Sequence, residues 1–189
     1  MRARLPRAQR ERQMLDSARA LFAARGYAEV TMDEVAAAVG VTKPLLYNYF
    51  GNKERLFLAC MKPAVDALVD SVVSAVQAAS DAPEALRLGI HAFFAFLDSD
   101  RDAWRVLYDE TLPGGGEIAA RVGEYRARLA ELVTAALQER TESPAVEPVS
   151  VAILGAAEAL GRWWLRTGQL SAERTAELLI RTIEPGLRT

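Results

Sequence analysis

The sequence of 189 residues is poor in the side chains from which metal sites and cross-links are built. It contains one cysteine, Cys60, and one histidine, His91. A single cysteine cannot form an intrachain disulfide, which is typical of a protein from a reducing compartment. Zinc sites draw on several clustered histidines and cysteines, and this pair is too small a set. We therefore expect no metal and no cofactor.

Long apolar runs are also missing, although apolar residues make up 51% of the chain, enough to form a core. The most apolar stretch of the C-terminal half, residues 151–165, is interrupted by Glu158 and Arg162. A transmembrane helix needs about 18 consecutive apolar residues, so we expect no membrane span. Five arginines in the first twelve residues, with no apolar segment after them, do not make a secretory signal. The sequence predicts a cytoplasmic protein.

Motifs of the common catalytic sites are absent as well. The glycine-rich segment 113–116 has neither a strand before it nor a lysine after it, as a phosphate-binding loop would. The carboxylates of Asp98, Asp100 and Asp102 lie at a predicted helix start, where they favour the helix dipole. We expect no catalytic residues and no enzymatic activity. A small helical enzyme is one alternative.

Positive charge is concentrated at one end of the chain. The net charge is only −2, but residues 1–55 carry ten Lys and Arg against six Asp and Glu, a net of +4. The remaining residues have a net charge of −6. A basic end on an acidic body is expected when one end of a protein approaches phosphates and the other does not.

Alanine, leucine, arginine and glutamate dominate, and runs with the alternation of β-strands are missing. The pattern predicts an all-α protein. We expect about nine helices, near residues 8–24, 32–39, 43–50, 53–79, 82–97, 101–111, 117–140, 149–166 and 171–184.

Residues 31–50 have the pattern of a helix-turn-helix. Thr31 is a good N-cap, and Glu34 three residues later completes a capping box. The segment Gly40-Val41-Thr42 suits a tight turn between two helices, and Pro44 falls in the first turn of the second helix. Apolar residues at 32, 35, 41, 46 and 50 are expected to hold the two helices together.

The second of these helices offers polar side chains suited to DNA. Its N-terminal residues, Lys43 and Pro44, should approach base edges, while Tyr47 and Tyr49 should reach phosphates. The tyrosines could instead be packed in a core, and the N-terminal arginines could form a solvated arm. The predicted DNA-binding residues are Arg4, Arg7, Thr31, Thr42, Lys43, Pro44, Tyr47, Asn48, Tyr49 and Lys53.

This segment resembles the signature of the TetR family of repressors, roughly T-x-x-x-I-A-x-x-A-G-V-S-x-x-x-L-Y-x-Y-F-x-x-K-E-x-L. Val35 and Thr42 are conservative variants, Val39 stands where alanine is usual, and Pro44 changes the surface shown to a base. The C-terminal two thirds match the family only in helix pattern. The matching positions are Thr31, Ala36, Gly40, Val41, Leu46, Tyr47, Tyr49, Phe50, Lys53, Glu54 and Leu56.

The resemblance implies a three-helix DNA-binding domain, residues 1–52, and a larger helical domain for ligand binding and dimerisation, residues 53–189. It implies a homodimer on double-stranded operator DNA. A small apolar or aromatic effector would move the fourth helix and release the operator, which describes a sequence-specific repressor. The alternative regulator has no small-molecule ligand and is controlled by a partner protein.

Two further sets of residues follow from the family's architecture. Aromatic side chains of the fifth to seventh helices could be ordinary core, but some are expected to line a cavity. We predict a ligand pocket with His91, Phe94, Trp104, Tyr108, Tyr125 and Arg128, although a surface or ordinarily hydrogen-bonded histidine is the favoured interpretation of His91 alone. We predict a dimer interface with Ala156, Leu160, Trp163, Leu178, Leu179 and Ile183.

Overall fold

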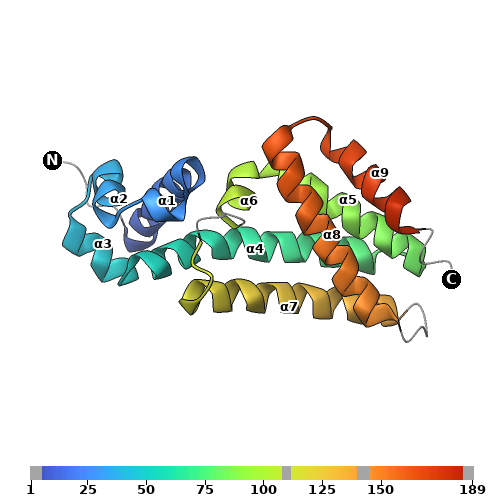
Figure 1. Cartoon of the computed structure of the whole chain (residues 1–189). Helices are drawn as coiled ribbons and strands as arrows, with labels where there is room; N and C mark the ends of the chain where they lie inside the picture. Colours follow the sequence, from blue (N-terminus) through green and yellow to red (C-terminus); the bar gives the residue numbers. More distant parts are fainter. Residues whose placement is uncertain (1–5, 108–111, 140–144, 185–189) are drawn as a thin grey trace. The chain divides into compact units, whose positions relative to one another are not determined.

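The structure is a computed structural model that describes residues 6–107, 112–139 and 145–184. Within these ranges the chain forms nine helices and no strand (Figure 1). The all-α prediction is confirmed. The helices are α1 (Arg7–Glu29), α2 (Met32–Val39), α3 (Lys43–Phe50), α4 (Lys53–Gln77), α5 (Ala82–Ser99), α6 (Arg101–Leu107), α7 (Gly116–Gln138), α8 (Val146–Thr167) and α9 (Ala172–Ile183).

The chain divides into two compact units. The head unit comprises residues 1–64 and 102–122, and the body unit comprises residues 65–101 and 123–189, as far as they are described. The predicted boundary at residue 52 differs, because residues 53–64 and 102–122 group with the head. The first turns of α4 explain the difference: Leu56 and Phe57 are fully buried, and the Phe57 ring meets Phe22 of α1 edge-to-face at 5.1 Å. The functional domain assignment itself stays a prediction.

In the head unit, α1 buries Met14, Ala18 and Phe22, which recur every four residues along one face. The helix was expected to end at Gly26. Gly26 indeed leaves helical geometry, with φ 80° and ψ 163°, and one more short helical stretch follows it. Such a positive φ is readily adopted only by glycine.

The helix-turn-helix forms as predicted. The Thr31 hydroxyl accepts from the Glu34 backbone N–H at 3.3 Å, and the Glu34 carboxylate accepts from the Thr31 backbone N–H at 2.8 Å. Gly40 ends α2 in the left-handed conformation, and Pro44 lies in the first turn of α3. The fully buried Val35 and Leu46 provide apolar contacts for the two helices.

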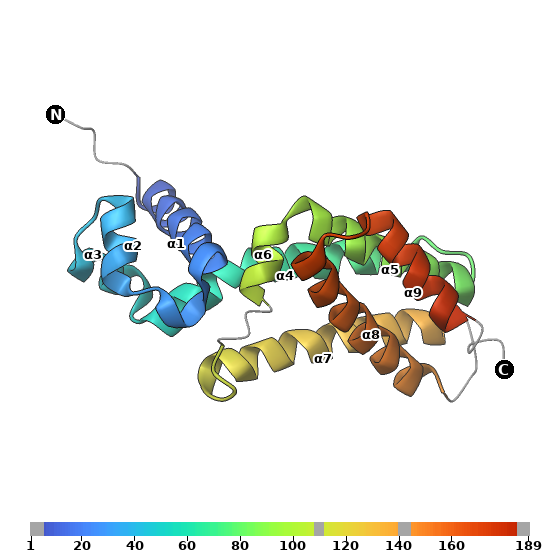
Figure 2. The ribbon, with the colours of Figure 1, turned by 45° about the horizontal axis from the view of Figure 1, so that its top comes forward.

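In the body unit, α5, α8 and α9 pack against one another (Figure 2). Trp164 of α8 is buried, and its indole N–H donates to the Leu170 carbonyl at 2.8 Å. The α8 helix begins at Val146 rather than near residue 149, because Pro148 fits the first turn, where its missing N–H costs no hydrogen bond. None of the described helices is long and apolar enough to cross a bilayer.

Candidate functional site: a DNA-reading surface and an apolar cavity

The outer face of α3 carries four of the ten predicted DNA-binding residues. Lys43, Pro44 and Asn48 are exposed, and Tyr47 is 40% exposed. Leu46 and Phe50 point the other way and are buried. Thr31 and Thr42, at the starts of α2 and α3, are exposed as well. Tyr47 therefore belongs to the surface, as expected, and not to the core.

Tyr49 is half-buried and contacts the start of α1. The guanidinium of Arg7 lies 5.4 Å from the centre of the Tyr49 ring, a cation–π contact. The pairing places Arg7 beside the recognition helix α3. Arg4, the other predicted arm residue, lies outside the described residues.

Lys53 has contacts that the sequence did not predict. Its ammonium donates to the Ala28 carbonyl at 3.2 Å and lies 4.3 Å from the centre of the Tyr27 ring. Partial burial lowers the pKa of Lys53. The lysine thus ties the start of α4 to the end of α1, which leaves only part of its donor capacity for a phosphate.

Two ion pairs surround the start of α2. Arg25 bonds Glu34 at 2.6 Å, and Lys43 bonds Asp33 at 2.8 Å. The hydrogen bond from Arg25, followed by those from Thr31, lowers the pKa of Glu34 to about 2. The hydrogen bond to Asp33 raises the pKa of Lys43. Sequence reasoning missed Arg25 and Asp33, because their partners are nine and ten residues away along the chain.

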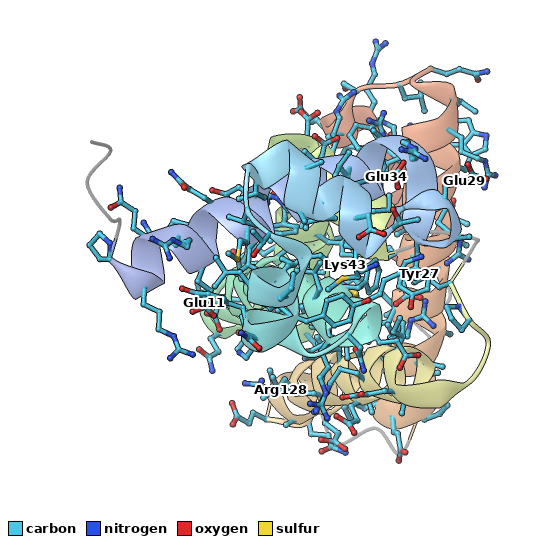
Figure 3. The ribbon with its side chains drawn as sticks, turned by 90° about the vertical axis from the view of Figure 1, so that its left-hand side faces the viewer. Glu11, Tyr27, Glu29, Glu34, Lys43 and Arg128 are labelled. Carbon is cyan, nitrogen blue, oxygen red and sulfur yellow. The ribbon has the colours of Figure 1, made fainter. Side chains whose placement is uncertain are left out.

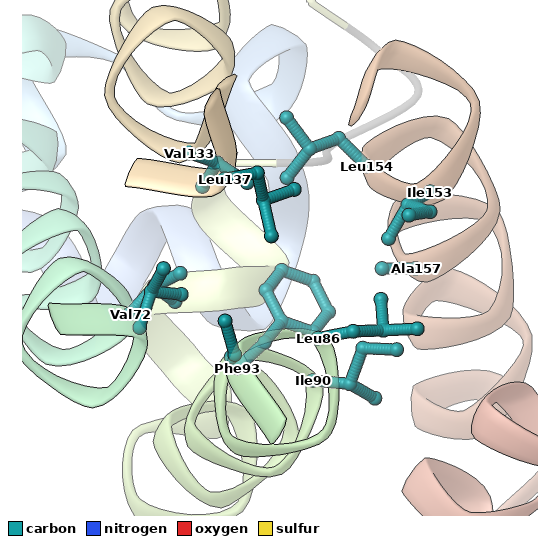
Figure 4. A pocket seen from close by; sticks show the side chains of 12 residues that line it. Val72, Leu86, Ile90, Phe93, Val133, Leu137, Ile153, Leu154 and Ala157 are labelled. Atoms are coloured by element: carbon teal, nitrogen blue, oxygen red, sulfur yellow. The ribbon is translucent and has the colours of Figure 1, made fainter. Parts of the chain in front are cut away.

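The body unit contains an apolar cavity of about 30 Å³ (Figure 4). Its walls come from α4, α5, α7 and α8, and every lining residue is apolar. The space is large enough for a water molecule, but it is far smaller than the hundreds of Å³ typical of ligand pockets. The lining residues are Val72, Val76, Ala85, Leu86, Gly89, Ile90, Phe93, Val133, Leu137, Ile153, Leu154 and Ala157.

Of the six predicted pocket residues, the five that the structure describes do not line this cavity. Phe94 is fully buried against Phe93, which lines the cavity instead. Adjacent residues of a helix point about 100° apart, so a difference of one residue decides that Phe93 and not Phe94 faces the cavity. His91 Nε2 lies 3.1 Å from Glu177 Oε1 and borders an open surface hollow between α5 and α9.

The other predicted pocket residues lie elsewhere. Trp104 is fully buried in the head unit and is not part of the body-unit cavity. Tyr125 is half-buried and Arg128 is exposed on α7. Tyr108 lies outside the described residues.

The predicted dimer residues are partly accessible, with one correction. Leu178 is 41% exposed, but Leu179 is 5% exposed because it packs into the core of its own chain. The remaining four predicted residues, Ala156, Leu160, Trp163 and Ile183, are half-buried. Val151, which the prediction omitted, is the most exposed large apolar side chain described, at 57%.

Two sequence-family models match the chain. Bacterial regulatory proteins of the tetR family match residues 14–60, which include the whole helix-turn-helix. The tetracyclin repressor-like C-terminal domain matches residues 82–185, more than half of the chain.

Individual relatives agree. The transcriptional activator FasR of Mycolicibacterium smegmatis is 38% identical over 119 residues, which are 63% of this chain and about half, 54%, of FasR. A TetR-like regulator from Rhodococcus sp. RHA1 is 34% identical, with a TM-score of 0.81 over 98% of this chain and 99% of that one. AibR, solved with isovaleryl coenzyme A and operator DNA, is 25% identical, with a TM-score of 0.71 over 90% and 96%. With both family models and a full-length relative in agreement, this chain belongs to the TetR family of bacterial regulatory proteins.

Proposed function

We propose that this protein is a homodimeric transcriptional regulator that binds operator DNA in the cytoplasm and responds to a small molecule with an apolar part. One observation carries the proposal: a capped helix-turn-helix exposes Lys43, Pro44, Tyr47 and Asn48 on one helix. Such a helix fits the major groove of B-DNA, with its N-terminal residues toward the bases.

Lys43 and Tyr47 have distinct roles in this proposal. The Lys43 ammonium suits the O6 and N7 acceptors of guanine, and the Tyr47 hydroxyl suits a phosphate. Two further residues are proposed to contact the DNA backbone. These are Arg7, which lies against Tyr49, and Thr31, at the start of α2. Arg4, Thr42 and Lys53 complete the proposed set.

The test begins with an operator selected by the full chain from random duplex DNA. Lys43→Ala should weaken binding to this duplex by roughly 1–3 kcal/mol and relax the preference at one base pair. Arg87→Ala is the matched control, since it removes an exposed cation from α5 of the body unit. Equal losses in the two variants, measured by fluorescence anisotropy, would refute the assignment of Lys43.

Dimerisation is proposed through the accessible faces of α8 and α9. Small exposed residues, Gly155 and Ala159, allow close helix approach beside Val151, and Leu178 is exposed on α9. Two heads would then read half-sites about one helical turn apart, or a multiple of it. Leu178→Glu should produce monomers in sedimentation experiments and weaken operator binding. A variant that stays dimeric would remove Leu178 from the interface.

The effector is proposed to place an apolar tail among α4, α5, α7 and α8, because only apolar side chains line the cavity there. AibR, which was solved with an acyl coenzyme A, makes this class the first to test. The cavity of about 30 Å³ must widen to accept an acyl chain. A ligand that binds the widened form alone shifts the population toward that form, which is how it would change operator affinity.

A substitution that fills the cavity with a larger side chain tests the proposed effector site. Ala157→Leu places a larger side chain in the wall, while Ala127→Leu makes the same change on the exposed face of α7. With a series of acyl coenzyme A thioesters in calorimetry, Ala157→Leu should lose binding and Ala127→Leu should retain it, and both should bind the selected operator. No binding of any thioester to the unaltered protein would favour control by a partner protein.

We propose repression as the outcome of operator binding. FasR is named an activator, so the sign of regulation is tested directly, with a reporter gene behind a natural promoter of the source genome that contains a match to the selected operator. Higher expression after deletion of the regulator supports repression, and lower expression supports activation.

A further inference from the structure

The start of α2 carries two neighbouring carboxylates, Asp33 and Glu34, on a unit proposed to approach phosphates. Glu34 has a structural role, since it closes the capping box with Thr31 and bonds Arg25. The side chains of Glu34 and Lys43 are labelled in Figure 3. Asp33 differs: among the described residues, its carboxylate makes one side-chain contact, to the Lys43 ammonium at 2.8 Å. That lysine opens the recognition helix α3.

The Asp33–Lys43 pair has little to offer the stability of the fold. Both side chains are largely exposed, 50% for Lys43 and 65% for Asp33. Ion pairs at this exposure contribute little to folding because water and salt screen them. The effect of the pair is therefore local: it places the Lys43 ammonium 2.8 Å from the Asp33 carboxylate at the surface.

We propose that Asp33 is a specificity-determining residue, which holds Lys43 for a base edge of the operator and withholds it from the phosphates of other DNA. This inference rests on the proposed DNA-binding function. A lysine ammonium has three donors, and the bond to Asp33 uses one of them. The remaining donors suit the guanine acceptors, and the second Asp33 oxygen suits the amino group of cytosine. A G·C pair thus matches both charges.

Phosphates match only one of the two charges. A lysine that turns to a phosphate leaves the Asp33 carboxylate unpaired in a strongly negative field, which opposes the move. Without the carboxylate charge, Lys43 is free to bind the DNA backbone at any sequence. Asp33 therefore lowers the affinity for arbitrary DNA more than the affinity for the operator.

Asp33→Asn tests the charge with little change of shape. The probes are the duplex selected by the unaltered protein and a scrambled duplex of the same length and composition. The variant should bind the scrambled duplex roughly three- to tenfold more tightly. The slope of the logarithm of its binding constant against the logarithm of salt concentration should be steeper by about 0.9, as expected for one additional phosphate contact. The ratio of the two affinities should fall about tenfold, comparable with the loss of one base-pair contact.

Three further variants make the result decisive. Asp98→Asn removes an equal charge and breaks another exposed pair, to Arg101 at 2.6 Å in the body unit, and should leave the ratio unchanged. Asp33→Glu keeps the charge and should keep most of the ratio. The double variant Asp33→Asn with Lys43→Ala should bind the scrambled duplex no more tightly than Lys43→Ala alone.

The outcomes separate the two proposals. An unchanged ratio in Asp33→Asn, or equal changes in Asp33→Asn and Asp98→Asn, overturns the role of Asp33 and leaves DNA binding intact. If the unaltered protein binds selected and scrambled duplexes alike, the proposed function itself fails. A gain on scrambled DNA that persists without Lys43 also overturns the inference, because Lys43 is then not the residue that Asp33 restrains.

Discussion

Gly89 of α5 provides a quantitative test of the packing around the cavity. A Cβ atom at this position would lie 2.9 Å from Cγ2 of Val76 on α4, whereas ordinary contacts begin at 3.4 Å. Val76 is 3% exposed, and its β-branched side chain has few alternative rotamers. Gly89→Ala therefore forces α4 and α5 apart by about 0.5 Å or strains the valine.

Two opposing effects set the change in the free energy of unfolding of Gly89→Ala. Alanine stabilises a helix interior by about 1 kcal/mol relative to glycine. Overpacking a dense core costs about 1–3 kcal/mol. The free energy of unfolding of Gly89→Ala should thus fall by roughly 0–2 kcal/mol.

Gly123→Ala on α7 is the matched control, because a Cβ there meets no atom within 4 Å. It should gain about 1 kcal/mol from helix propensity alone. The two variants should then differ by about 2 kcal/mol, or roughly 4–8 °C in melting temperature for a chain of this size. The assay is urea and thermal unfolding followed by circular dichroism.

A second substitution isolates the clash. Val76→Ala removes the methyl group that the new Cβ would meet, so Gly89→Ala should cost about 1 kcal/mol less in that background than alone. If Gly89→Ala stabilises the protein as much as Gly123→Ala, the close approach of α4 and α5 is wrong. Additive effects of Gly89→Ala and Val76→Ala would equally contradict the reasoning.

Three further predictions concern the head unit. Leu46→Ala, at a fully buried position of α3, should cost about 2–5 kcal/mol in urea unfolding and abolish operator binding in parallel. Because the pKa of Glu34 is depressed to about 2 from 4.5, its contribution to stability is complete above pH 4.5 and is lost as the pH falls toward 2. Glu34→Gln should therefore reduce the loss of melting temperature between pH 4.5 and pH 2, and an unchanged loss would contradict the assignment. Burial raises the pKa of the Cys60 thiol to about 12, so it should react with thiol reagents near neutral pH only as the protein unfolds. Fast labelling without denaturant would show that α4 opens locally.

Local signals in the sequence located the helix ends well. Besides Thr31, the side chains of Asp81 and Ser171 cap α5 and α9 by accepting from backbone N–H groups three residues on. Each cap depends only on neighbours within one turn, so the sequence alone specifies it.

Positions decided by tertiary packing were harder to predict. Leu178 and Leu179 are chemically alike, and only the contacts of α9 with α5 and α8 decide that Leu179 is buried. Phe93 and Phe94 pose the same problem at the cavity. The contact of Lys53 with Ala28 spans 25 residues, and no periodicity in the sequence signals it. The helix-turn-helix was predictable because its caps, turn and apolar spacing all lie within 20 residues.

The contacts of the head unit explain why its charge is a poor guide to its affinity for DNA. Residues 1–55 carry ten Lys and Arg, yet Lys43 and Arg25 are in ion pairs and Lys53 is bonded to a carbonyl. Fewer cations are therefore free for phosphates than the composition indicates, which limits the counterion release of a single head. We therefore expect strong operator binding to come from base contacts at fixed positions and from the two linked heads of the proposed dimer, because linkage makes the second contact effectively intramolecular. The proposed dimer and the proposed role of Asp33 serve the same end, since each raises the affinity for the operator relative to the affinity of one head for arbitrary DNA.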